Sequence, residues 1–206
     1  MCGIVGYVGE KQAANFLIDG LTKLEYRGYD SAGIAVFDGE KINVAKSVGR
    51  LAALKEKIKN NTPEGVMGIG HTRWATHGRP SDVNSHPHTD CSGKFAIVHN
   101  GIIENFMSLK EELIAKGHKF VSETDTEVVA HLIEDVYEGD FVEAVNKVLN
   151  RIEGSYSLAF MCQDYPDTLI CTKKDNPLVI GLGEGENFIA SDIPAIIAYT
   201  RRTYIM

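Results

Sequence analysis

The sequence predicts an α+β fold, built as a four-layer αββα sandwich with two stacked sheets inside and helices on both outer faces. Strand-like segments come in groups along the chain, and helix-like segments come in groups between them. This order is neither a βα alternation nor purely β, so it favours the α+β class. Roughly nine or ten candidate strands in two groups would fit two stacked sheets. No Pro/Ser-rich linker divides the 206 residues, so one domain is expected.

The individual elements are predicted from the spacing of apolar residues and from the turn residues between them. The predicted strands span residues 2–8, 31–37, 41–47, 66–72, 94–100, 155–162, 168–174, 177–182 and 187–191. The predicted helices span residues 11–28, 49–60, 105–117, 128–138 and 141–152.

Four local signals support these elements, taken in chain order. The first helix ends at Gly28 and places four apolar residues on one face, namely Ala14, Leu17, Leu21 and Leu24. The pair Asp38-Gly39, between two strands, is typical of hairpin turns. Helix 105–117 ends at Gly117 and has three apolar residues on one face, Phe106, Leu109 and Leu113. Thr124 and Glu127 match a capping box before the fourth helix.

Composition and charge exclude several classes of protein. The net charge is −7 and the isoelectric point is near 5.5, so no basic surface for nucleic acid is expected. We find no apolar run of the ~18 residues that a membrane span needs. The N-terminus lacks the basic start and apolar core of a signal peptide. A cytoplasmic protein is therefore predicted, without contact to nucleic acid or membrane.

The four cysteines are predicted to be free thiols, because none forms a C-x-x-C pair and the predicted compartment is reducing. Cys162 and Cys171 lie in apolar runs and are predicted to be core residues. Five of the seven histidines fall between residues 71 and 99, close to Cys91. Their spacing matches no zinc signature, so neither a metal nor another cofactor is predicted.

Cys2 directly follows the initiator methionine. Removal of Met1 would leave a residue with a thiol and a free amine on the same carbon. A terminal amine has a pKa of about 7.7–8.0 and can accept the proton of a thiol at neutral pH. One residue would then supply a nucleophile and its base, suited to attack on a carbonyl carbon.

Five motifs follow one another in the order expected for one enzyme family. They are C-G-I-V-G at 2–6, R-G-Y-D-S-A-G at 27–33, H-T-R-W-A-T-H-G at 71–78, H-N-G-I-I-E-N at 99–105 and T-D-T-E at 124–127. The chain resembles the glutaminase domains of glutamine–fructose-6-phosphate aminotransferases, which belong to the class II glutamine amidotransferases. The amidophosphoribosyltransferases and asparagine synthetases share the first cysteine and the N-G pair, and they rank second because their second and third motifs differ.

The resemblance implies an N-terminal-nucleophile hydrolase fold over residues 2–206, with L-glutamine as substrate and no cofactor. The sugar isomerase domains of such an enzyme are expected beyond this chain. They would use the released ammonia to convert fructose 6-phosphate into glucosamine 6-phosphate, in hexosamine biosynthesis, and the full-length enzyme would be a homodimer or higher oligomer. A non-catalytic glutamine-binding module and a metal-binding domain built on the histidine cluster are the alternatives from other functional classes.

The resemblance also implies roles for individual residues. Cys2 would be the nucleophile. The Asn100 side-chain amide and the Gly101 N–H would form the oxyanion hole, although Asn-Gly between two apolar runs is equally typical of a hairpin turn. The remaining roles are substrate binding by Arg73, Trp74, Thr76, His77 and Asp125.

For several of these residues a purely structural role stays open. Arg73 would bind the glutamine α-carboxylate through its planar guanidinium, but a lone arginine is usually a surface residue. Asp125 would bind the α-ammonium, or it would only complement the dipole in the first turn of a helix. Trp74 would close over glutamine, or it would pack in the core. Supporting roles near the nucleophile and the glutamine-binding loop fall to Arg27, Gly28, Tyr29, Asp30 and His86.

Overall fold

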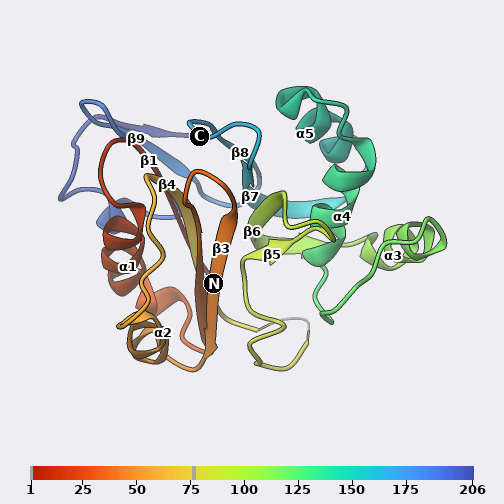
Figure 1. Ribbon diagram of the computed structural model, residues 1–206, viewed down its shortest axis with the longest axis horizontal. Coiled ribbons are helices and arrows are strands. Elements are labelled where there is room, and N and C mark those ends of the chain that lie inside the picture. Colours follow the sequence, from red (N-terminus) through yellow and green to blue (C-terminus); the bar gives the residue numbers. More distant parts are fainter. Residues whose placement is uncertain (1, 76–77) are drawn as a thin grey trace.

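Two antiparallel β-sheets lie next to each other in the middle of the molecule, with helices on their outer faces (Figure 1). The computed structural model describes residues 2–75 and 78–206. One sheet has seven strands in the order β11-β9-β10-β1-β4-β2-β3, and the other has four in the order β5-β6-β7-β8. The predicted α+β class with two stacked sheets is confirmed.

The strands and helices follow the predicted order. The strands are β1 (Gly3–Val8), β2 (Ser31–Phe37), β3 (Ile42–Val48), β4 (Met67–Arg73), β5 (His88–Thr89), β6 (Phe95–Ile103), β7 (Gly154–Cys162), β8 (Leu169–Lys174), β9 (Val179–Leu182), β10 (Asn187–Ala190) and β11 (Thr203–Ile205). The helices are α1 (Ala13–Lys23), α2 (Leu51–Ile58), α3 (Phe106–Ala115), α4 (Glu127–Val136) and α5 (Phe141–Leu149). The sequence missed β5 and β11, which have only two and three residues and therefore show no periodicity.

Three apolar clusters separate the four layers. The first lies between α1, α2 and the seven-stranded sheet, and it contains the predicted face of α1, for example Leu17 and Leu21. The second lies between the four-stranded sheet and α3 to α5, for example Leu113 and Phe160. The third fills the space between the two sheets. Since each sheet is covered on both faces, central strands such as β1, β2 and β4 are buried along nearly their whole length instead of at alternate residues.

Local differences from the prediction have physical reasons. The hairpin at Asp38-Gly39 is confirmed, because β2 and β3 pair in antiparallel register across it. The α-helix α1 ends at Lys23, and a 3-10 turn at Glu25–Arg27 carries the chain on to Gly28. The capping box is wrong: Glu127 is the first residue of α4 and accepts hydrogen bonds from the Val121 and Ser122 N–H groups instead.

All four cysteines are free thiols. Cys162 is fully buried, as predicted for a core residue. Cys171 is only partly buried, because its strand β8 is the edge of the four-stranded sheet. Among the described helices, none is long and apolar enough to cross a membrane.

Candidate active site

Strand register brings three of the five motifs together at one end of the seven-stranded sheet. β1 pairs with β4 so that Gly3 lies opposite Thr72, which places Cys2 beside the end of β4. β2 pairs with β4 on its other edge, and its first residue, Ser31, lies opposite Arg73. The beginning of the 27–33 motif and residues 72–74 of the 71–78 motif therefore lie next to Cys2.

A cavity of about 290 Å³ opens at this position, between the ends of the two sheets. Eight predicted site residues line it, namely Cys2, Arg27, Arg73, Trp74, His86, Asn100, Gly101 and Asp125. Seven further lining residues were not predicted as site residues: His99, Ile102, Thr124, Thr126, Ser155, Asn176 and Pro177. The last three come from the β7 region and the segment before β9, which carry no recognisable motif, although His99, Ile102, Thr124 and Thr126 lie inside motifs that the sequence had marked.

The Cys2 thiol lies against the backbone of Trp74. The Trp74 N–H donates a hydrogen bond to Sγ at 3.2 Å, and Sγ lies 3.5 Å from the Trp74 carbonyl oxygen. Burial raises the pKa of the Cys2 thiol above its ordinary value, although the Trp74 N–H opposes this shift. The thiol is therefore protonated at neutral pH, and a reaction at sulfur needs a base.

The side-chain amide of Asn100 is oriented by His71. The Nε2 atom of His71 lies 2.9 Å from the His99 carbonyl oxygen, which can only accept, so Nε2 carries a proton. The same Nε2 lies 3.0 Å from Asn100 Oδ1. The Asn100 oxygen therefore faces His71, and its NH₂ group faces Cys2, where Nδ2 donates to the Cys2 carbonyl oxygen at 3.1 Å. Burial lowers the pKa of His71 to about 3, so its ring is neutral.

Gly101 lies inside a strand and not in a turn. β6 continues through Asn100 and Gly101 to Ile103 while it pairs with β7, so the hairpin alternative for Asn100-Gly101 is wrong. Gly101 has φ +122°, and a Cβ at this position would come within 2.0 Å of the Ser155 carbonyl oxygen. Only glycine fits here, because both the backbone angle and the close contact exclude a side chain.

Two buried charged side chains, Arg73 and Asp125, line the same cavity. Arg73 is 3% exposed, and its Nη2 donates to the Gly78 carbonyl oxygen at 3.0 Å. Asp125 is 4% exposed and accepts a hydrogen bond from the Ile103 N–H at 2.8 Å. Asp125 precedes α4 and does not lie in its first turn, so this part of the prediction is corrected. The surface role left open for Arg73 is excluded by its burial.

The neighbourhood of Asp125 contains a neutral histidine. His99 Nδ1 lies 4.0 Å from Asp125 Oδ2 and 2.8 Å from Thr126 Oγ1. Burial lowers the pKa of His99, although Asp125 opposes the shift. His86 also contacts Thr126 Oγ1, at 2.9 Å, and burial holds its pKa well below the ordinary value. Neither ring is a cation at neutral pH, so neither neutralises the Asp125 carboxylate.

Residues of the 27–30 segment contact the backbone of Cys2 and the end of β4. Arg27 Nε donates to the Cys2 carbonyl oxygen at 3.1 Å, and Nη1 pairs with Asp192 Oδ2 at 3.1 Å. Gly28 packs directly on the Arg73 backbone, where a Cβ would come within 2.7 Å of the carbonyl carbon. Asp30 accepts a hydrogen bond from the Ala75 N–H and so holds the chain beyond β4.

Trp74 lies at the rim of the cavity. Its side chain is 49% exposed, which excludes the core-packing alternative. Its ring meets the Tyr29 ring edge-on, with centroids 5.4 Å apart. Thr76 and His77, predicted to contact substrate, lie outside the described residues.

The fold agrees with the comparisons with known proteins. Residues 71–198 match the model of the family described as "Glutamine amidotransferase domain". The chain is similar over 99% of its length to the glutamine phosphoribosylpyrophosphate amidotransferase of B. subtilis, a structure with ADP and GMP (TM-score 0.83, 29% identity, 47% of that chain covered). It is equally similar to a structure of the allosteric regulatory enzyme of purine biosynthesis (TM-score 0.82, 30% identity, 99% and 46% covered). The chain therefore belongs to the glutamine amidotransferase domain family, with the fold of its class II members.

Within this family the chain is most clearly related to one kind of enzyme. It is 61% identical to the glutamine–fructose-6-phosphate aminotransferase [isomerizing] of Caldanaerobacter subterraneus subsp. tengcongensis and 55% identical to that of Clostridium tetani, in both cases over all 206 residues. These identities are about twice those to the two amidotransferase structures above. The chain spans 34% of the length of these relatives.

Proposed function

We propose that the chain hydrolyses the side-chain amide of L-glutamine to glutamate and ammonia, with Cys2 as nucleophile. The observation that carries this proposal is the meeting of the Cys2 thiol and the Asn100 amide at one cavity, with the NH₂ group turned toward Cys2. A thiol beside a fixed hydrogen-bond donor is the arrangement that acyl transfer requires.

In this mechanism Cys2 Sγ attacks the amide carbon, and its proton passes to the Cys2 amine after removal of Met1. The amine then delivers the proton to the departing ammonia. Asn100 Nδ2 and the Gly101 N–H stabilise the oxyanion of the tetrahedral intermediate. A γ-glutamyl thioester forms, and water releases glutamate from it. The raised pKa of the thiol explains why such a base is needed.

The two buried charges of the cavity would select the amino-acid end of the substrate. The Arg73 guanidinium can bind the α-carboxylate through two hydrogen bonds. The Asp125 carboxylate, beside a neutral His99, would find its counterion in the α-ammonium group. A simple amide such as butyramide lacks both groups and could make neither contact, so it should be a far poorer substrate.

The relatives suggest the fate of the ammonia. Because the chain aligns with about a third of proteins named glutamine–fructose-6-phosphate aminotransferase [isomerizing], we infer that it is the ammonia-supplying part of such an enzyme. The chain alone should then release glutamate but form no glucosamine 6-phosphate, whatever the concentration of fructose 6-phosphate.

A glutaminase assay on protein of known N-terminal mass tests the proposal. Processed protein should release glutamate, and Cys2→Ala should reduce the rate to background while glutamine still binds. Cys171→Ala, which removes a free thiol outside the cavity, is the matched control and should keep full activity. Glutamine binding without hydrolysis by the processed, unmutated protein would instead favour the non-catalytic binding module. Full activity with Met1 still attached would refute the role of the amine.

A further inference from the structure

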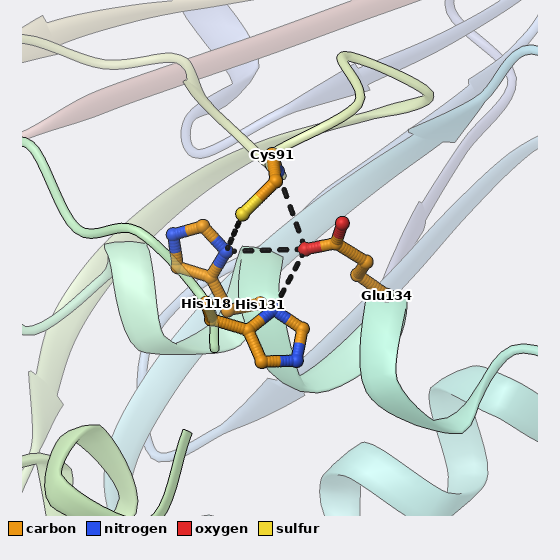
Figure 2. A group of neighbouring side chains, drawn as sticks. All are labelled: Cys91, His118, His131 and Glu134. Carbon is orange, nitrogen blue, oxygen red and sulfur yellow. Dashed lines mark hydrogen bonds and ion pairs between the residues drawn. The ribbon is translucent and has the colours of Figure 1, made fainter. Parts of the chain in front are cut away.

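Four side chains of metal-binding type meet at one end of α4, and none of them lines the cavity described above. Cys91 follows β5, His118 follows α3, and His131 and Glu134 lie one turn apart on α4 (Figure 2). One candidate ligand atom from each residue lies within 4.8 Å of all the others. The sequence had grouped Cys91 with the histidines at 71–99, so this set was missed.

Three of the six distances between the ligand atoms are near those of a tetrahedral site, and all six are within 4.8 Å. With metal bonds of about 2.0–2.3 Å, the ligand atoms of a tetrahedral zinc site lie about 3.3–3.6 Å apart. Cys91 Sγ lies 3.6 Å from His131 Nδ1, which lies 3.3 Å from Glu134 Oε2. His118 Nδ1 lies 2.9 Å from the same Glu134 oxygen. Binding an ion would draw the more distant ligand atoms together, by up to about 1 Å from the 4.8 Å limit.

Each histidine also has a carboxylate near the ring nitrogen that faces away from the cluster, slightly beyond hydrogen-bond distance. Each directs Nδ1 into the cluster and Nε2 to a carboxylate outside it. His131 Nε2 lies 3.6 Å from Glu127 Oε1, and His118 Nε2 lies 3.6 Å from Asp135 Oδ1. Carboxylates in this position fix the tautomer and strengthen the histidine as a ligand. Backbone N–H groups complete the surroundings: that of Lys119 donates to Cys91 Sγ at 3.4 Å.

The donor set indicates the metal. One thiolate and one carboxylate balance a divalent cation, and the two imidazoles are neutral. A sulfur ligand disfavours Mg²⁺ and Ca²⁺, which take oxygen ligands. Zinc accepts thiolate, imidazole and carboxylate ligands, and four protein ligands leave no open position, as in a structural site. Cys91 is exposed, and Glu134 is partly so, which leaves a path for the ion to enter.

We propose that Cys91, His118, His131 and Glu134 bind a structural Zn²⁺ ion. The ion would join the chain beyond β5 and the chain beyond α3 to α4. It would also fix His131, whose partner Glu127 accepts hydrogen bonds from the Val121 and Ser122 N–H groups just before Asp125. The zinc site would therefore stabilise the segment that leads to the cavity without taking part in the reaction.

Cobalt binding tests the proposal, because a thiolate bound to Co²⁺ gives a charge-transfer band in the near ultraviolet. We would use the chain with Cys2→Ala, since a terminal cysteine binds metals itself. After treatment with chelator, this protein should bind one equivalent of Co²⁺ with a charge-transfer band, and Zn²⁺ should remove the band. Adding Cys91→Ser should abolish the band. Adding Cys171→Ser, the control for loss of an unrelated thiol, should leave it unchanged.

Thermal unfolding gives a second readout. At a hundredfold excess of Zn²⁺ over its dissociation constant, the melting temperature should exceed that of the chelated protein by about 5–10 °C. Neither the Cys91→Ser nor a His118→Gln variant, both in the Cys2→Ala background, should show this rise. The proposal is overturned if Co²⁺ gives no charge-transfer band, if the band survives Cys91→Ser, or if Zn²⁺ leaves the melting temperature unchanged. The four side chains would then form a metal-free hydrogen-bonded cluster around Glu134. Because both readouts use a variant without the nucleophile, their result is independent of the glutaminase proposal.

Discussion

Replacement of Asn100 by alanine is the sharpest test of the proposed oxyanion hole. The variant loses the Nδ2 donor that faces Cys2, while the Gly101 N–H remains. Loss of one such donor lowers kcat by about 10²–10³, equivalent to about 2.7–4 kcal/mol of transition-state stabilisation. Since the donor would act only on the developing charge, kcat and kcat/KM should fall by the same factor and KM should stay nearly constant.

According to the structure, this loss of activity would not come from a displacement of Cys2. Asn100 Nδ2 donates to the Cys2 carbonyl oxygen, but Arg27 Nε donates to the same oxygen at 3.1 Å, so Cys2 keeps an anchor in the variant. The rate of Cys2 alkylation by iodoacetamide should therefore change little in Asn100→Ala. Steady-state glutamate release and the alkylation rate, measured on the same preparation, separate the two effects.

His71 provides the matched variant. His71→Phe removes the donor that orients the Asn100 amide but retains a ring of similar size against His86. It should lower kcat by less than Asn100→Ala, and the double variant should be no worse than Asn100→Ala alone, because His71 would act only through Asn100. A kcat of Asn100→Ala within threefold of the unmutated protein, or a loss found entirely in KM, would refute the role of Asn100 in the transition state.

Three further predictions concern substrate binding, backbone conformation and pH. Asp125→Asn should raise KM for glutamine about 10- to 100-fold, because a hydrogen bond to a charged group contributes about 1.5–3 kcal/mol. A KM within twofold of that of the unmutated protein would contradict the role of Asp125 in binding the α-ammonium group. Gly101→Ala should strongly destabilise the fold, since its Cβ would come within 2.0 Å of a carbonyl oxygen. Gly93 has φ +74° and nothing within 4 Å of the added Cβ, so Gly93→Ala should lower the free energy of unfolding by only about 1 kcal/mol. Equal melting temperatures of the two variants would contradict this difference. Burial lowers the pKa of His71 to about 3. Between pH 6.5 and pH 3, His71 therefore binds a proton in the unfolded chain but not in the folded one. The free energy of unfolding should fall as the pH falls below 6.5. The contribution is about 1.4 kcal/mol per pH unit, and urea unfolding should show a correspondingly smaller pH slope in His71→Phe; an unchanged slope would contradict it.

The helices and longer strands could be predicted because their signals are local. The apolar face of α1 and the turn at Asp38-Gly39 each depend on residues close together in the chain, and both are confirmed. Interpretations of single residue pairs were wrong where a group distant in the sequence formed a different contact with one of the residues. Glu127 accepts hydrogen bonds from the Val121 and Ser122 N–H groups and does not form the capping box with Thr124. Asn100-Gly101 is part of a strand because β7 pairs with it.

The sequence by itself determined which chemistry is available: a cysteine next to the start residue, an Asn-Gly pair, and candidate arginine and aspartate residues in five ordered motifs. Only the tertiary structure decided how these groups meet. The β1–β4 register places Cys2 beside Trp74, and His71 chooses the face that Asn100 presents. The grouping of Cys91 with His118 and His131 was likewise invisible along the chain. The reason is physical: periodicity reports which face of an element is apolar, whereas distances between remote polar atoms depend on how the sheets and helices pack.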